Sequence, residues 1–223
     1  MIHFNTHVLL VLALVGGLVA VDGTSFGQFM ISRPFVAATL GGWVAGMPQQ
    51  GAILGVALEC FHLGVLPVGA SKQPESGPAA VAAGAFFAGA EPTASILILT
   101  ILGTLLLEHL GGWTVHLERL INVWIIAPNG ALPTVANLER RHLTAIGLDF
   151  LRGAVLVMIG SLLLSLVVPV LDPYWGLSES LTNWMVVTFI IAMLAGSLRM
   201  LGSKYWFAAL GAGIGLVGLW MTR

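Results

Sequence analysis

The chain has 223 residues, of which 57% are apolar and 9% are charged, whereas charged residues make up roughly 25% of soluble domains. This composition, with a mean hydropathy of +0.96, excludes an ordinary soluble domain and indicates a membrane protein. Nine basic and ten acidic residues give a net charge of -1, which excludes the basic surface that nucleic-acid binding needs. The single cysteine, Cys60, excludes an internal disulfide and a thiolate zinc site built by one chain.

The first apolar run along the chain covers Val8–Ala20. No Lys or Arg precedes it, and Asp22 begins a polar, glycine-containing stretch where the cleavage site of a signal peptide would be expected. We therefore expect a first helix that is retained in the protein rather than a signal peptide.

Glycines and prolines interrupt the apolar runs as far as Leu110, whereas the later run Val155–Val168 contains one Gly and no Pro. Broken segments at membrane depth are tolerated only where neighbouring protein or a water-filled cavity satisfies the freed backbone groups. We therefore expect residues 1–110 to form broken or re-entrant helices around a translocation site. Within this half, Pro74 and Pro78 predict a loop or re-entrant tip.

The longest polar stretch is the segment 111–150, with Pro128 and Pro133 in its middle. It predicts an extramembrane connection with amphipathic ends. Four Lys or Arg residues lie in the stretch from Gly111 to Arg152, both ends included, whereas the later connection 172–183 contains two acids and no base. The positive-inside rule therefore places the first connection in the cytoplasm and the second outside.

Regular transmembrane helices are expected in residues 151–223. Stretches without an ionised residue follow Arg152, Glu179 and Lys204 and run for 19, 19 and 18 residues. At about 1.5 Å per residue each spans roughly 27 to 29 Å, close to the bilayer hydrocarbon thickness of about 30 Å. The last of them predicts a final helix, Tyr205–Thr222.

The chain is thus predicted to be one membrane-embedded domain, 1–223, with an all-α fold: a polytopic helical bundle with broken or re-entrant helices in its first half. Because a charge at the bilayer centre is costly, ionisable residues there face a cavity or pair with one another. In the apolar first half, each of the following is a candidate for the site or for an internal ion pair: Asp22, Arg33, Glu59, Lys72 and Glu75.

Glu59 and Glu75 are the strongest candidates for binding a ligand. Glu59 lies in the middle of an apolar run, and the prolines around Glu75 project its carboxylate from a tip. With the amide of Gln28 and the hydroxyls of Ser71 and Ser76, they form the acceptor-rich set that a sugar needs. The alternative is that these carboxylates pair with Lys72 or Arg33 and serve only the fold.

The histidines carry weaker signals. His62 follows Glu59 by three residues, so it lies on the same helical face, where it could line the cavity or simply pack with a hydrogen bond. His109 and His116 are better explained by the membrane interface than by metal binding. No phosphate-binding loop, nucleophile elbow or dinucleotide fingerprint follows a strand pattern, so we expect neither catalysis nor a cofactor.

The run Val21-Asp-Gly-Thr-Ser-Phe-Gly-Gln-Phe-Met-Ile-Ser-Arg-Pro-Phe-Val-Ala-Ala-Thr-Leu-Gly-Gly42 resembles the N-terminal signature of the IIC components of the mannose/fructose/sorbose class of the bacterial phosphotransferase system. The segment Gly51–Ala70, followed by Pro74-Glu75, is similar to another segment of that family. Pro67 stands where mannose-specific members have an amide, so no sugar specificity is carried over. The chain is also shorter than the family pattern by some tens of residues.

The resemblance implies a multi-pass permease subunit in the bacterial cytoplasmic (inner) membrane that binds and translocates a hexose-like sugar. A IID membrane subunit would accompany it, cytoplasmic IIA and IIB phosphocarriers would phosphorylate the sugar, and we expect an oligomer. The alternatives are a non-transporting scaffold or sensor, and a transporter of another polar solute without phosphorylation. The expected sugar contacts are Gln28, Glu59 and Glu75, with Lys72 and His62 nearby, and the expected docking residues for the phosphocarriers are Arg119, Arg140 and Arg141.

Overall fold

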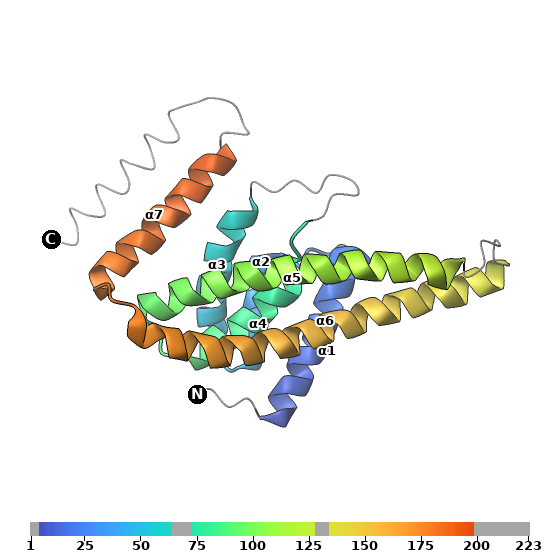
Figure 1. The fold of residues 1–223 in the computed structure, drawn as a ribbon, viewed down its shortest axis with the longest axis horizontal. Coiled ribbons are helices and arrows are strands. Elements are labelled where there is room, and N and C mark those ends of the chain that lie inside the picture. Colours follow the sequence, from blue (N-terminus) through green and yellow to red (C-terminus); the bar gives the residue numbers. More distant parts are fainter. Residues whose placement is uncertain (1–4, 64–72, 128–133, 199–223) are drawn as a thin grey trace.

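The computed structural model describes residues 5–63, 73–127 and 134–198, and within them the chain is helical, with no strand (Figure 1). The expected all-α fold is therefore confirmed. The helices are α1 (Thr6–Thr24), α2 (Pro34–Val44), α3 (Pro48–His62), α4 (Ser76–Gly89), α5 (Ala94–Ile126), α6 (Val135–Leu171), the 3-10 turn η1 (Asp172–Tyr174) and α7 (Glu179–Leu198).

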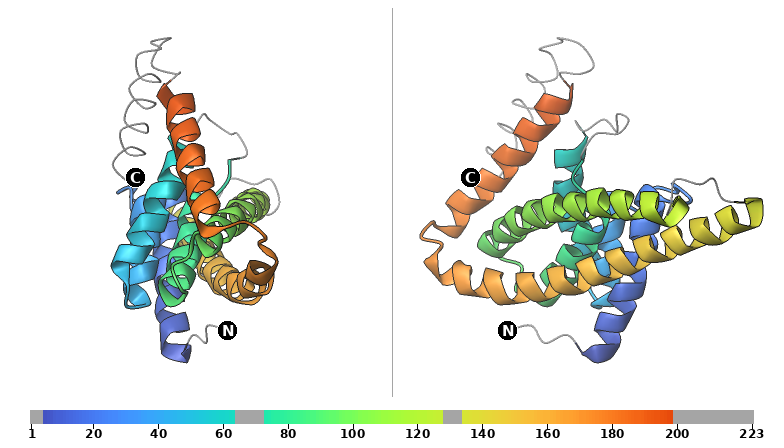
Figure 2. Two further views of the ribbon diagram at one scale, coloured as in Figure 1. Left: turned by 90° about the vertical axis from the view of Figure 1, so that its left-hand side faces the viewer. Right: turned by 45° about the vertical axis from the view of Figure 1, so that its right-hand side comes forward.

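Three helices of the described residues are long and apolar enough to cross a membrane: α1, α5 and the helix that contains α6. The helices α5 and α6 have 33 and 37 residues. At about 1.5 Å per residue they measure roughly 50 and 55 Å, which exceeds the hydrocarbon thickness of about 30 Å. They lie side by side, and both extend well beyond the rest of the bundle at the end where they are connected (Figures 1 and 2).

The helices α2, α3 and α4 have 11, 15 and 14 residues, too few to cross the bilayer singly. They form a compact group in which glycines permit close approach of the backbones. A Cβ atom on Gly41 of α2 would overlap the carbonyl oxygen of Val81, and one on Gly84 of α4 would overlap that of Ala38. This agrees with the expectation of broken helices in the first half of the chain.

Two details of the first half differ from the sequence interpretation. Gly16 and Gly17 do not interrupt α1, which is continuous; they give α6 a close approach at Val157 and Phe150. The second difference is Pro78, which lies in the first turn of α4, where a proline costs no intrahelical hydrogen bond. The helices α1 and α4 therefore include residues that were expected to interrupt a helix.

The expected connection 111–150 is also mostly helical. The helix α5 continues to Ile126 and α6 begins at Val135, so only the short stretch between them separates two long helices. The two long helices α5 and α6 pack on each other in this region, as the views in Figure 2 show.

In the second half, α6 and α7 occupy the first two charge-free stretches, as expected. Pro169 falls in the last turn of α6, and the chain then turns through η1 into α7. The expected final helix, Tyr205–Thr222, lies outside the described residues.

Candidate functional site

The loop from Ser25 to Arg33, between α1 and α2, has an unusual backbone. Gly27, Gln28 and Met30 have φ values of 103°, 52° and 67°. A positive φ is ordinary for glycine and uncommon for Gln and Met. The loop therefore presents its side chains from a conformation that the rest of the structure must hold.

A second irregular segment, the tip 73–75 that precedes α4, docks on α5. The backbone N–H of Glu75 donates to the carbonyl of Glu108 at 2.9 Å. Gly111 and Gly112 permit this approach, since a Cβ on Gly112 would overlap the carbonyl oxygen of Gln73. Glu75 is the N-cap residue of α4, so its carboxylate is fixed at a helix terminus rather than on a free tip.

Arg152 of α6 binds the side chain of Glu75. Its Nη1 and Nη2 atoms donate to Oε2 and Oε1 of Glu75, the latter at 2.6 Å. Nε donates to Oε2 of Glu118 on α5 at 2.8 Å, Nη2 also donates to Oδ1 of Asp149 at 2.6 Å, and Nη1 also contacts the hydroxyl of Thr114 at 3.1 Å. Since a guanidinium has five N–H donors, these contacts use all of them.

This network joins four helices. The hydroxyls of Thr24 and Ser25, at the end of α1, donate to Oδ2 of Asp149. The side chain of Asp149 is fully buried, and those of Arg152, Glu75 and Glu118 are 10%, 9% and 11% exposed. Buried charges need such complete pairing, because the loss of hydration is otherwise uncompensated.

An open cavity of about 380 Å³ lies beside this network. Its walls come from the end of α1, the loop 25–33, the tip and start of α4, and one face of α5. The polar side chains that line it are Thr24, Gln28, Ser32, Gln73, Glu75, Ser76, His116 and Arg119. Hydroxyls, amides and a carboxylate around one cavity are the groups that bind polyols.

Of the predicted sugar-binding residues, the structure brings Gln28 and Glu75 together in this cavity. Although Arg152 occupies both oxygens of Glu75, a carboxylate has about four lone-pair positions, so it can still accept hydrogen bonds from a ligand. The predicted residue Lys72 and its neighbour Ser71 lie outside the described residues.

Glu59 does not line the cavity. It forms an ion pair with Arg33, and its Oε2 accepts a hydrogen bond from the backbone N–H of Phe35 at 3.2 Å, in the first turn of α2. A carboxylate at a helix N-terminus is favourably placed. Glu59 thus holds the end of the loop 25–33 in place, which is the pairing with Arg33 that the sequence left open as the alternative.

His62 also lies apart from the cavity lining. Its Nε2 is 3.1 Å from Oε2 of Glu108, whose side chain is 1% exposed, and its Nδ1 is 2.9 Å from the carbonyl of Leu58. The partner of His62 is therefore Glu108 on α5.

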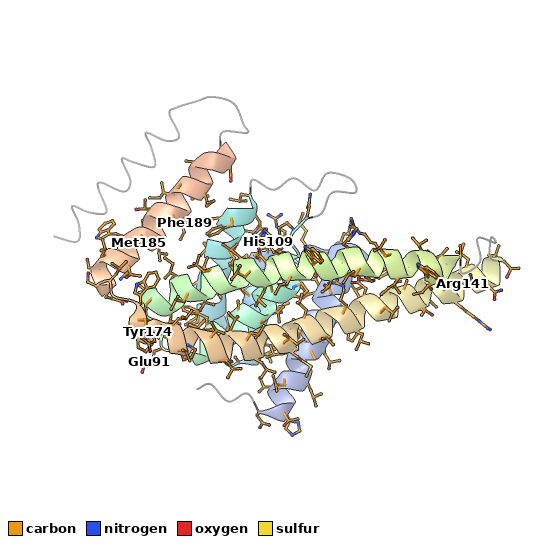
Figure 3. The ribbon with its side chains drawn as sticks, in the orientation of Figure 1. Glu91, His109, Arg141, Tyr174, Met185 and Phe189 are labelled. Carbon is orange, nitrogen blue, oxygen red and sulfur yellow. The ribbon has the colours of Figure 1, made fainter. Side chains whose placement is uncertain are left out.

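The three predicted docking arginines fall in two places. Arg119 is exposed and lines the cavity. Arg140 and Arg141 lie near the start of α6, at the far end of the long helix pair, where Figure 3 labels Arg141. Arg141 donates to the carbonyl of Ile126 at 2.5 Å, and Arg140 is exposed.

Sequence reasoning missed the network of Arg152. Arg152 served there as the border of an apolar stretch, and Glu118 and Asp149 were expected in the extramembrane connection 111–150. One signal was available: Asp149 and Arg152 are three residues apart, and such residues are neighbours on a helix. The partners Glu75 and Glu118 are distant in sequence, so no spacing rule could have identified them.

Comparison with known proteins supports one family. The family model described as "PTS system sorbose-specific iic component" matches residues 6–202. The sorbose-specific EIIC component of Klebsiella pneumoniae is 27% identical over 190 residues, which cover 82% of this chain and 70% of that protein. The alignments with another sorbose-specific and a mannose-specific EIIC component cover only 20% and 29% of those relatives.

Two solved structures share the fold at 20% sequence identity. One, described only as a membrane protein, has a TM-score of 0.72. The other is a chain from the complex of the mannose transporter ManYZ with microcin E492, with a TM-score of 0.53. Each alignment covers 99% of this chain and 95% of the solved chain.

Proposed function

Because this chain belongs to the family of sorbose-specific IIC components of the phosphotransferase system, a family of multi-pass membrane permease subunits, we propose that its cavity binds a hexose-like sugar for translocation. The observation that carries the proposal is that Gln28 and Glu75, which lie 47 positions apart in the sequence, line one polar cavity at the junction of α1, α4 and α5. Two irregular segments, the loop 25–33 and the tip 73–75, form part of its wall, as expected for a translocation site.

The binding residues that we propose are Gln28 and Glu75, with the hydroxyls of Thr24, Ser32 and Ser76 around them. Gln28 supplies both a donor and an acceptor, and Glu75 supplies charged acceptors. Glu59 and His62 would take part only at another site or in another conformation, since neither lines this cavity. Their ion-pair contacts favour a role in holding α3 against its neighbours.

The partners that we propose are those of the family: a IID membrane subunit, cytoplasmic IIA and IIB phosphocarriers and a bacterial cytoplasmic membrane around the assembly. The likeness to a chain of the ManYZ transporter supports a membrane partner, because that transporter is solved as a complex. Phosphoryl transfer would be the work of the phosphocarriers. This chain would bind and deliver the sugar, and it would provide the surface on which the phosphocarriers dock.

The test is sugar binding by the full chain in lipid nanodiscs, measured by calorimetry with sorbose, mannose, fructose and glucose. Gln28→Ala removes a neutral hydrogen-bonding group worth about 1 kcal/mol, so affinity for the bound sugar should fall roughly fivefold. Glu75→Gln exchanges charged for neutral hydrogen bonds, which predicts a loss of about two- to thirtyfold.

The matched control is Glu91→Gln, at an exposed residue labelled in Figure 3 that does not line the cavity. Thermal unfolding of each variant separates lost binding from lost folding. Full sugar affinity in well-folded Gln28→Ala and Glu75→Gln proteins would remove this cavity as the sugar site. A wild-type chain that binds none of the sugars, with and without the IID subunit, would favour a scaffold or a carrier of another solute.

A further inference from the structure

Asp22 lies beneath the loop that carries Gln28. It is the third-last residue of α1, and it is 3% exposed. Its two carboxylate oxygens accept hydrogen bonds from two backbone N–H groups of the loop: Oδ1 from Phe29 at 2.5 Å and Oδ2 from Ser32 at 3.0 Å. No ion pair of Asp22 with another described residue is found.

The two N–H groups lie on either side of Met30, and the residue before Phe29 is Gln28. These are the two non-glycine residues with positive φ, at 52° for Gln28 and 67° for Met30. Residues such as Gln and Met rarely adopt that conformation unless the surrounding structure over-determines it. The carboxylate of Asp22 provides such a constraint, because charge-assisted hydrogen bonds to backbone N–H groups are among the stronger ones.

The loop is held at its other end as well. Arg33 pairs with Glu59, and the N–H of Phe35 donates to the same carboxylate. Between these two anchors the loop delivers Gln28 and Ser32 to the cavity. The buried carboxylate of Asp22 contacts the loop on both sides of its positive-φ residue Met30.

We propose that Asp22 is a positioning residue for the sugar site: its carboxylate holds the loop 25–33 in the left-handed conformation that brings Gln28 to the cavity wall. This inference rests on the proposed function for its sugar readout. Asp22 does not line the cavity, so its effect on the ligand passes through the loop.

The first test is Asp22→Asn, which keeps the shape of the side chain. The amide oxygen can accept one of the two N–H groups, while the NH2 group faces the other N–H as a second donor. We expect about tenfold weaker sugar binding in calorimetry. The matched control is Asp172→Asn, a half-buried carboxylate that accepts the hydroxyl of Ser95 away from the cavity, and its sugar affinity should be unchanged.

A double-mutant cycle separates positioning from a general structural role. If Asp22 acts through Gln28, the variant Asp22→Asn should lose much less affinity on a Gln28→Ala background than on the wild-type background. Replacing Met30 by Gly on the Asp22→Asn background should recover part of the affinity, because glycine adopts the left-handed conformation without the anchor. If Asp22 had only a general structural role, Asp22→Asn would lose the same sugar affinity on the Gln28→Ala background as on the wild-type background. Met30→Gly would then recover none of that affinity.

A measurement of the loop conformation that needs no sugar tests the role of Asp22 independently of the proposed function. Gln28→Cys on a Cys60→Ala background places one thiol in the loop, and its rate of reaction with a maleimide reports the conformation. Adding Asp22→Asn should change that rate severalfold, and adding Asp172→Asn should not. An unchanged rate, or an equal affinity loss on both backgrounds, would overturn the role of Asp22, whereas a changed rate without sugar binding would count only against the proposed function.

Discussion

Arg152 of α6 and Glu75 at the start of α4 form a two-point ion pair in which both terminal nitrogens of the guanidinium meet both carboxylate oxygens. The pair joins a transmembrane helix of the second half to the cavity of the first half. It also explains how an acidic residue is stable beside the sugar site that we propose: its charge is compensated by Arg152, and free lone pairs remain for a ligand.

Replacing Arg152 by Lys should destabilise the protein strongly. A lysine retains the charge but offers three donors from one atom, so it cannot serve Glu75, Glu118 and Asp149 together. Breaking a buried ion pair costs about 3 to 5 kcal/mol, and the retained charge should bring the loss toward the lower figure. For a protein of this size about 3 kcal/mol corresponds to a fall in Tm of roughly 6 to 12 °C.

Thermal unfolding in one detergent checks that expectation, with Arg140→Lys as the control. Arg140 is exposed and lies outside the network, so its replacement should leave Tm unchanged. A Tm of Arg152→Lys equal to that of Arg140→Lys would mean that the network contributes little to stability.

Two Gly→Ala substitutions, one in the short helix α4 and one in the long helix α6, should have opposite effects on stability. Gly84→Ala should prevent close packing of α4 on α2, because its Cβ would overlap the carbonyl oxygen of Ala38, a backbone atom that cannot turn aside. Gly147→Ala places its Cβ in α6 with nothing within 4 Å and should stabilise that helix by up to about 1 kcal/mol.

Yield of folded protein by size-exclusion chromatography, followed by Tm, measures both effects. We expect Gly84→Ala to be recovered poorly and Gly147→Ala to equal or exceed the wild type. Normal recovery and Tm for Gly84→Ala would contradict the close α2/α4 packing.

The topology prediction concerns the two ends of α6. Asn137, near its start, and Ser178, beyond its end, are both exposed and are separated by the whole length of the helix. Because basic residues are concentrated near Asn137, that end should face the cytoplasm. In intact cells an impermeant thiol reagent should label Ser178→Cys and not Asn137→Cys, each on a Cys60→Ala background.

Labelling after the membrane is permeabilised serves as the control, since both positions should then react. Labelling of position 137 alone in intact cells would reverse the orientation.

The salt dependence of phosphorylation tests the exposed end of the helix pair as a docking surface. The side chain of Arg140 has no hydrogen bond or ion pair with the described residues, whereas that of Arg141 donates to the carbonyl of Ile126, so Arg140→Glu is the cleaner substitution. We expect this variant to slow phosphocarrier-dependent sugar phosphorylation at low salt. Rising salt should lower the wild-type rate toward that of the variant, because ions screen exposed charges.

The control adds the same charge at the opposite end: Ser178→Glu should leave the rate and its salt dependence unchanged. A wild-type rate that salt does not affect, together with an unaffected Arg140→Glu rate, would exclude this end from the docking site.

The sequence by itself determined the class of protein and the place of its regular helices. A low content of charge and long apolar stretches depend on composition and local order, and both signals survive without knowledge of the fold. That is why α6 and α7 lie where the charge-free stretches predicted them. The resemblance of the first hundred residues to the IIC components also needed no structure, and the family match confirmed it.

Only the tertiary structure decided which charged residues meet. Glu75 and Arg152 are 77 positions apart, and nothing local distinguishes their pairing from the pairing of Glu75 with Lys72 or Arg33 that the sequence allowed. In the same way, Glu59 was expected at the sugar and lies instead against Arg33 and the start of α2. A buried charge is stable only with its partners in place, and those partners are chosen by the packing of helices, which local sequence does not encode.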